Sequence, residues 1–423
     1  MGLAILLGVF AGVMLMGVPV AFALGIAAIS AFMYEGLPLM VGYQRIVAGM
    51  STFALLAVPF FIFAGDLMLH GGIAARLIRF ASSSVGWMRG GLAQVNVFSS
   101  MLFGGISGSA VADISALGSL LIPVMKEKGY DDDFAVNVTV TSSIAGIVIP
   151  PSHNMIIYAA ASGESISIGD LFIAGILPGI LCGLALMVVV SIIARKKGYP
   201  KGLFPGFKAL LLSAVAALPG LLTAVIIVVG ILGGVFTPTE SSAVAIVYTI
   251  IIGVFFYRSL GLKEFKAAVI NSAKTTALIM LIIGSAAAFG WLLALLEAPL
   301  MMSNLILGMT SSPTIIMLLV LISLLVLGTF MDMAPLIIIV TPIFLPVVQT
   351  IGVDPVHFGI IMMLALGIGT ITPPVGTVLF VGSAVGKIRM EDTVKTMWPF
   401  YLALILCLLI VTYVPQISLF LVG

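Results

Sequence analysis

Two stretches of the sequence, "GIVIPPSHN" at 146–154 and "GTITPPVGT" at 369–377, place a glycine four residues before a pair of prolines. Each stretch lies in an apolar run long enough to be a membrane helix. In a continuous helix the N–H of residue i donates to the carbonyl of residue i−4, and proline has no N–H. The prolines therefore predict a break in each helix and four carbonyls without helical partners, those of Gly146, Ile147, Gly369 and Thr370.

These carbonyls indicate a cation site at each break. An unpaired carbonyl in hydrocarbon costs several kcal/mol, so another group must satisfy it. Freed carbonyls and half-helix ends coordinate Na⁺ in several transporter folds, whereas helix N-termini face anionic substrate groups. We therefore expect a bare monovalent cation at each break. Substrate is expected at the residues that begin the second half-helices, Ser152, His153, Asn154 and Thr377.

Two further polar stretches, "SGS" at 107–109 and "TFMD" at 329–332, lie at the centres of apolar regions. Ser107 and Ser109 supply hydroxyl groups, and Asp332 supplies a carboxylate. An ionisable residue buried in a membrane is a functional candidate by default. These three residues are therefore predicted to bind substrate.

Other ionisable residues leave more than one interpretation open. Asp113 is either functional or the cap of a helix. His153 binds substrate, senses protons or is a satisfied polar residue. Asp66, Glu240 and Glu297 lie near predicted membrane ends, and we expect them to be solvated or to cap helices.

The composition requires a membrane protein around these motifs. The chain of 423 residues is 61% hydrophobic and 8% charged, with a mean hydropathy of +1.31. The fold class predicted is an all-α polytopic membrane protein with about ten spanning helices. Apolar segments are predicted at 3–17, 18–34, 48–70, 134–162, 171–194, 209–231, 240–257, 270–296, 357–386 and 397–421. Two regions with polar or proline-containing centres, 92–125 and 314–350, are predicted to be re-entrant helical hairpins.

The basic residues support this topology. If neither hairpin crosses the membrane, every one of the 18 Lys and Arg residues except Arg45 falls on one side. Cytoplasmic loops carry such an excess of positive charge. The basic residues form no stripe interleaved with aromatic residues, so we expect no nucleic-acid partner.

An internal repeat relates the two halves of the chain. Positions 223 residues apart match at several glycines and prolines, including Pro150–Pro151 with Pro373–Pro374, and Ser109 falls in register with Asp332. We predict two inverted-topology repeats. The first is 1–200, with a hairpin at 92–125 and a broken helix at 134–162. The second is 205–423, with a hairpin at 314–350 and a broken helix at 357–386.

The motifs "LFGGISGSAVAD", "IAGIVIPPSHNMIIY" and "ITPPVGTVLF" resemble those of the large membrane subunit of tripartite ATP-independent periplasmic (TRAP) transporters. The resemblance covers essentially the whole chain. It implies an elevator-type secondary transporter of the bacterial inner membrane, with a scaffold domain and a transport domain. Na⁺ would be the coupling ion, with no cofactor. The substrate would be an organic acid: sialic acid, another sugar acid or a C4-dicarboxylate.

The resemblance also implies partners and sodium ligands. The partners would be a small four-helix membrane subunit and a periplasmic substrate-binding protein. One sodium site would use Gly104, Ser109, Gly146, Ile149 and Pro151. A second would use Gly328, Thr329, Gly369 and Thr372.

Three other functions are alternatives to this interpretation. The first, also within transport, is a stand-alone sodium- or proton-coupled dicarboxylate carrier that needs no binding protein. The second is a channel, which is disfavoured because paired hairpins with helix breaks suit alternating access. The third is a membrane enzyme, against which the sequence argues because it has no nucleophile–base pair, zinc-ligand spacing or H-E-x-x-H motif.

Overall fold

The computed structural model describes residues 1–164 and 166–422, and its regular structure within these ranges is helical, as predicted. A single isolated β-bridge joins Arg89 to Lys201 in the described chain. The elements are α1 (Gly2–Leu15), α2 (Val20–Tyr34), α3 (Leu39–Met50), η1 (Phe53–Leu56), α4 (Ala57–His70), α5 (Ile73–Val85), α6 (Gly91–Ser107), α7 (Ala110–Asp113), η2 (Ile114–Gly118), α8 (Ser119–Glu127), α9 (Asp132–Val148), α10 (His153–Ala161), α11 (Ile168–Lys197), α12 (Phe207–Leu232), α13 (Pro238–Ile251), η3 (Ile252–Phe256), α14 (Leu262–Leu295), α15 (Ala298–Met309), α16 (Pro313–Gly328), α17 (Met333–Thr350), α18 (Pro355–Thr370), α19 (Thr377–Gly386), α20 (Met390–Thr396), α21 (Trp398–Tyr413) and α22 (Gln416–Leu419).

Several of these helices are apolar enough to cross a membrane. Among the described residues, five helices pass a test of length and composition, or up to eight when each sharply bent pair is taken as one span. The separation of 3–34 into two helices is confirmed, because α1 ends at Leu15 and α2 begins at Val20 after Pro19.

The prediction of a single segment at 48–70 is wrong. Helix α3 begins at Leu39 and ends at Met50, and α4 begins only at Ala57. Helix α5 was not predicted, because its apolar residues form only one stripe and Arg76 and Arg79 interrupt the run. Helix α5 bends away from α4 by 67°, at Gly72, whose φ of 74° suits glycine.

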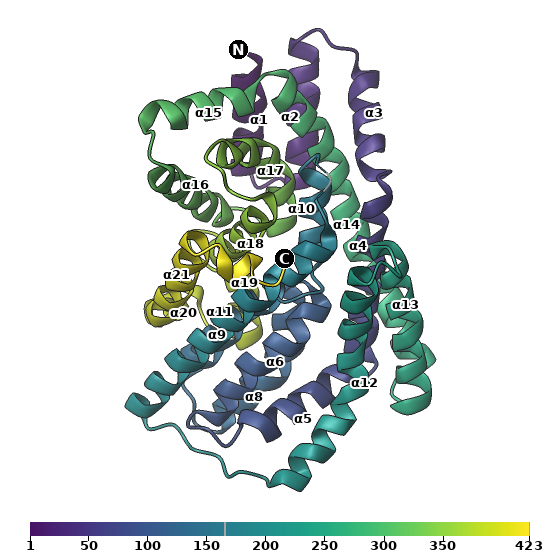
Figure 1. The fold of residues 1–423 in the computed structure, drawn as a ribbon, viewed down its shortest axis with the longest axis vertical. Helices are drawn as coiled ribbons and strands as arrows, with labels where there is room; N and C mark the ends of the chain where they lie inside the picture. Colours follow the sequence, from purple (N-terminus) through teal and green to yellow (C-terminus); the bar gives the residue numbers. More distant parts are fainter. Residues whose placement is uncertain (165, 423) are drawn as a thin grey trace.

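The helices form two groups (Figure 1). One group contains α1–α5 together with α12–α14, in which α14 packs against α2, α3 and α4. In this group Phe32 stacks on Trp291, with ring centroids 5.6 Å apart. The guanidinium of Arg45 lies 4.9 Å from the centroid of the same Trp291 ring. This cation–π contact ties α3 to α14.

The other group surrounds α9 and α18. Helix α9 packs against α6, α11 and α18, and α18 packs against α16 and α17. All residues of α18 from His357 to Thr370 are buried, as expected for a helix that is apolar all round. Buried hydroxyl groups of α9 bond within their own helix, for example Ser143 Oγ to the Val140 carbonyl at 2.8 Å, so these polar groups need no water.

Two helix–turn–helix units belong to this second group. In the first, α6 packs against α7, η2 and α8, and the chain turns at Gly108, whose φ is 62°. In the second, α16 packs against α17, and the chain turns between Gly328 and Met333. These units coincide with the two regions for which hairpins were predicted.

Candidate functional site

Both helices with doubled prolines break where the sequence predicts. Helix α9 ends at Val148, and α10 begins at His153 at an angle of 54° to it. Helix α18 ends at Thr370, and α19 begins at Thr377. The peptide bonds within both proline pairs are cis. The first break, at 149–152, is largely buried, whereas Pro374 and Val375 of the second break are exposed.

The prediction that the glycine carbonyls lose their backbone partners is wrong. The Gly146 carbonyl accepts from the Ile149 N–H at 3.1 Å, and the Gly369 carbonyl accepts from the Thr372 N–H at 2.8 Å. Each helix satisfies the carbonyl by tightening its last turn to an i→i+3 bond, which helix ends commonly do. A carbonyl oxygen has two lone pairs, so each can accept a further contact.

The second break has two additional side-chain hydrogen bonds. The Tyr401 hydroxyl donates to the Ile371 carbonyl at 2.5 Å, and the Thr372 hydroxyl donates to the Ile368 carbonyl at 2.7 Å. These bonds satisfy two more backbone oxygens near the prolines and hold the α18 end in place.

Glycines of the hairpins pack directly on glycines of the broken helices. A Cβ added at Gly104 would lie 2.4 Å from the Gly146 Cα, and one added at Gly369 would lie 2.5 Å from the Gly328 Cα. No side chain fits in either contact. The structure thus brings together Gly104 with Gly146, and Gly328 with Gly369, as the two predicted sodium sites require.

Each hairpin tip bonds to the break in its own half of the chain. The Asn154 amide donates to the Gly108 carbonyl at 3.1 Å. In the second half, the Gly376 N–H donates to the Thr329 carbonyl at 3.0 Å. These bonds fix the tips beside the starts of α10 and α19.

Ser109 and Asp332 occupy corresponding positions at the two tips. Ser109 is the N-cap of α7, and its hydroxyl accepts from the Ala112 N–H at 3.3 Å. Asp332 is the N-cap of α17 but makes no side-chain capping bond. Their register, expected from the spacing of 223 residues, is therefore seen in the structure.

Asp113 is not the cap of the second helix of its hairpin, because Ser109 has that position. Asp113 is fully buried, and its carboxylate makes no hydrogen bond of normal geometry, although the Ser100 hydroxyl of α6 lies close enough to interact with it. A buried carboxylate is costly unless it is paired, protonated or bound to a cation. The structure thus argues against the capping interpretation, because Asp113 makes no side-chain capping bond.

A cavity of about 460 Å³ lies between the two groups of helices. It brings together four of the predicted substrate residues, Ser109, His153, Asn154 and Asp332. The first tip contributes Ser109, the second contributes Asp332, and α10 contributes the other two.

The remaining substrate candidates do not line this cavity. Ser152 is fully buried one residue before α10, and Thr377 begins α19 outside the lining, whereas its neighbour Val378 is part of it. Successive side chains of a helix point about 100° apart, so neighbours in the sequence face different directions. Being next to a lining residue in the sequence therefore does not bring Ser152 or Thr377 into the cavity. Ser107 ends α6, and its side chain lies outside the described part of the chain.

Asp66 also lines the cavity, from α4 on the opposite wall, with Thr275 of α14. Asp66 lies well inside α4, so it does not cap that helix, and its half-buried side chain lines the cavity. One signal could have identified it: a carboxylate within the apolar run "FIFAGDLML". Glu240, by contrast, forms a capping box with Thr237 at the start of α13, as expected.

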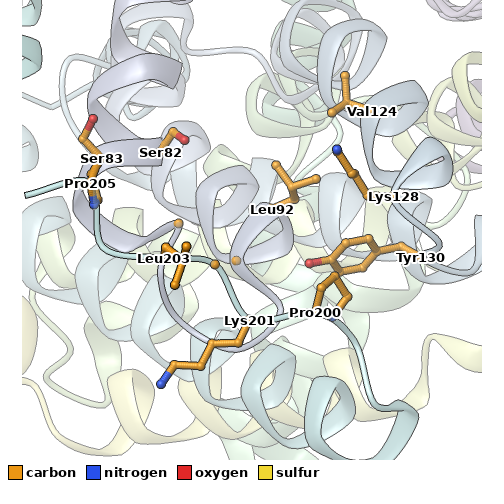
Figure 2. Close-up of a pocket in the computed structure, with 13 residues that line it drawn as sticks. Ser82, Ser83, Leu92, Val124, Lys128, Tyr130, Pro200, Lys201, Leu203 and Pro205 are labelled. Atoms are coloured by element: carbon orange, nitrogen blue, oxygen red, sulfur yellow. The ribbon is translucent and has the colours of Figure 1, made fainter. Parts of the chain in front are cut away.

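A second cavity of about 320 Å³ lies at the ends of α5, α6 and α8, beside the α11–α12 connection. Figure 2 shows its lining side chains, among them Lys128, Tyr130 and Lys201. None of the predicted substrate or sodium residues lines it, so the cavity between the helix groups is the candidate site.

Comparison with known proteins identifies the family. The profile of the "Tripartite ATP-independent periplasmic transporter, DctM component" family matches residues 7–417. The chain belongs to this family. It is the large permease component of a TRAP transporter, a multi-pass membrane protein and not an enzyme.

Relatives at 39% identity agree with this assignment. The chain is 39% identical to the C4-dicarboxylate TRAP transporter large permease DctM of Vibrio cholerae, covering 99% of this chain and 97% of that protein. It is also 39% identical to the sialic acid TRAP transporter large permease SiaM of the same organism, covering 97% and 96%. In fold, the DctM component resembles the YdaH transporter of Alcanivorax borkumensis, with a TM-score of 0.64 at 13% identity, covering 89% and 88%.

Proposed function

We propose that this DctM component carries an organic acid across the bacterial inner membrane, driven by a sodium gradient. The observation that carries the proposal is the cavity between the helix groups, lined by both hairpin tips and by α10 at the first helix break. Irregular backbone at membrane depth is tolerated only where it is covered by protein or lines a cavity, and here it adjoins one.

The sodium sites are proposed at the two glycine contacts. The first uses Gly104, Ser109, Gly146, Ile149 and Pro151, and the second uses Gly328, Thr329, Gly369 and Thr372. The close backbone contacts at Gly104–Gly146 and Gly328–Gly369 support this assignment, because carbonyl ligands need backbone that approaches without intervening side chains. Asp113 is a further candidate ligand of the first site, since it is buried on the same hairpin.

Two inverted repeats, 1–200 and 205–423, are proposed to form the transport unit. The matching positions of Ser109 and Asp332 at the hairpin tips support the pairing of the two halves. We propose further that α6–α11 with α16–α22 move as a transport domain against α1–α5 with α12–α14 as the scaffold, by an elevator mechanism. The position of the cavity between these groups supports this division.

The partners proposed are a small four-helix membrane subunit and a periplasmic substrate-binding protein, as in TRAP transporters generally. The substrate proposed is a sugar acid, such as sialic acid, or a C4-dicarboxylate, because relatives are described as permeases for such acids. The test is uptake by liposomes that contain the chain and its small subunit. Uptake should require the binding protein, and equal uptake without it would favour a stand-alone carrier.

Asp332→Ala is expected to reduce the rate of uptake at least about tenfold, and more than Asp66→Ala does. Hydrogen bonds to charged groups are worth about 1.5–3 kcal/mol, and 1.4 kcal/mol corresponds to a factor of ten. Asp332 lies on a hairpin tip that bonds to a helix break, whereas Asp66 belongs to the opposite group of helices. Initial uptake rates of the two variants at equal protein content check this prediction. A larger loss of uptake in Asp66→Ala than in Asp332→Ala would contradict it.

A further inference from the structure

The charged side chains that line the cavity between the helix groups restrict the class of acid that the cavity accepts. Its described lining contains two carboxylates, Asp66 and Asp332, one imidazole, His153, and no Lys or Arg. Hydrogen bonds from a charged basic side chain to a carboxylate are roughly twice as strong as those between neutral groups. Here a ligand with two carboxylates finds a basic side chain for one of them at most.

The two carboxylates of the cavity differ in their surroundings. Asp332 lies at a hairpin tip, on the wall that holds the helix breaks and the proposed sodium sites. Asp66 belongs to α4, whose part of the wall includes Ile62 and Leu69. The sodium ions proposed at the glycine contacts lie on the wall opposite Asp66. They therefore do not neutralise the Asp66 carboxylate, whose negative charge faces the ligand.

The wall that contains His153 suits a single carboxylate. His153 is the first residue of the nine-residue helix α10, so its imidazole lies beside a helix N-terminus, where the dipole favours negative charge. An ionised Asp66, in contrast, only accepts hydrogen bonds. Hydroxyl groups of a ligand are suitable donors for it, and the hydroxyl of Thr275, which also lines the cavity, can both donate and accept.

Resting on the proposed transport function, we infer that Asp66 is a specificity-determining residue that selects polyhydroxylated monocarboxylates and rejects dicarboxylates. The ligand's carboxylate lies toward His153, and its hydroxyl groups lie toward Asp66. Apolar lining residues such as Phe103 and Ile279 contact its carbon chain. A second carboxylate at the far end of the ligand lies beside the negative charge of Asp66 and is repelled by it.

The test compares D-gluconate with D-glucarate, six-carbon hydroxy acids that differ in having one or two carboxylates. Binding of each acid to the purified chain with its small subunit is measured by thermal-shift titration at a fixed sodium concentration, without the binding protein. Because apposed like charges cost several kcal/mol, wild type should bind gluconate at least about tenfold more tightly than glucarate. Asp66→Asn should reduce this ratio at least about threefold, mainly by tightening glucarate binding.

Asp170→Asn is the matched control, because Asp170 lies in the first turn of α11 and does not line the cavity. The ratio of gluconate affinity to glucarate affinity in this control should equal that of wild type. Equal or tighter binding of glucarate by wild type overturns the inference but leaves sodium-dependent acid transport intact. An unchanged ratio in a folded Asp66→Asn variant also overturns it. If neither acid binds while sodium-driven uptake of another acid persists, the assigned substrate class is wrong but the proposed function stands.

Discussion

Gly146→Ala is expected to reduce sodium-dependent uptake at least about tenfold and to lower the thermal stability of the protein. The added Cβ would lie 2.6 Å from the Ser100 carbonyl oxygen and 2.9 Å from the Gly104 Cα. Both are backbone atoms of α6, so α6 and α9 must separate. Overpacking of a well-packed core costs about 1–3 kcal/mol, and 1.4 kcal/mol is a factor of ten.

The control for this variant is Gly12→Ala in α1, where a Cβ would meet no atom within 4 Å. It should retain wild-type uptake and thermal stability. The measurements are initial uptake rates in proteoliposomes and the melting temperature of the purified protein. Wild-type sodium dependence in Gly146→Ala would mean that the close approach of α6 and α9 has no part in the ion site.

Replacing both Pro150 and Pro151 with alanine is expected to weaken the apparent sodium affinity at least about tenfold. The new N–H groups can donate to the carbonyls of Gly146 and Ile147 as in a continuous helix, which would straighten the bend between α9 and α10. The Gly146 carbonyl, a proposed sodium ligand, would then be held in an i→i+4 helical bond and displaced from the ion. Removing two prolines from a helix interior also favours helical backbone by about 3 kcal/mol each.

The sodium dependence of uptake, measured as a titration at fixed substrate, checks this prediction. Pro178→Ala is a suitable control, because Pro178 lies inside the continuous helix α11. It should leave the sodium affinity unchanged. If the double variant keeps the wild-type sodium affinity, the first break does not contribute ligands to the ion.

The sequence predicted the local features of the site well, because proline and glycine act through their own backbone. The break positions in α9 and α18 follow from the missing N–H groups. Ser109 and Asp332, which the spacing of 223 residues aligns, both lie at helix N-caps in the hairpin tips. The hydrogen bond from the Ile149 N–H to the Gly146 carbonyl was not predicted. The sequence shows that Pro150 lacks the N–H for an i→i+4 bond, but it does not show that the N–H three residues on takes its place.

Features that depend on packing between distant helices could not be predicted. The carboxylate within the apolar run 61–69 marks Asp66 as a candidate, but its place in the cavity depends on how α4 and α14 pack beside the second helix group. Likewise, Ser152 and Asn154 are two residues apart, yet only Asn154 lines the cavity. The direction of a side chain near a helix start depends on where the helix begins, which sequence patterns fix only to within a few residues.

The measurement that tests the central claim most directly is accumulation of the transported acid in liposomes that contain the chain, its small subunit and an external binding protein. The inward gradient is made either with Na⁺ or with K⁺, and a pH gradient is applied in a separate arm. We predict accumulation above the external concentration only with the inward Na⁺ gradient. Equal accumulation with K⁺, or accumulation driven by the pH gradient alone, would contradict sodium coupling at the two helix breaks.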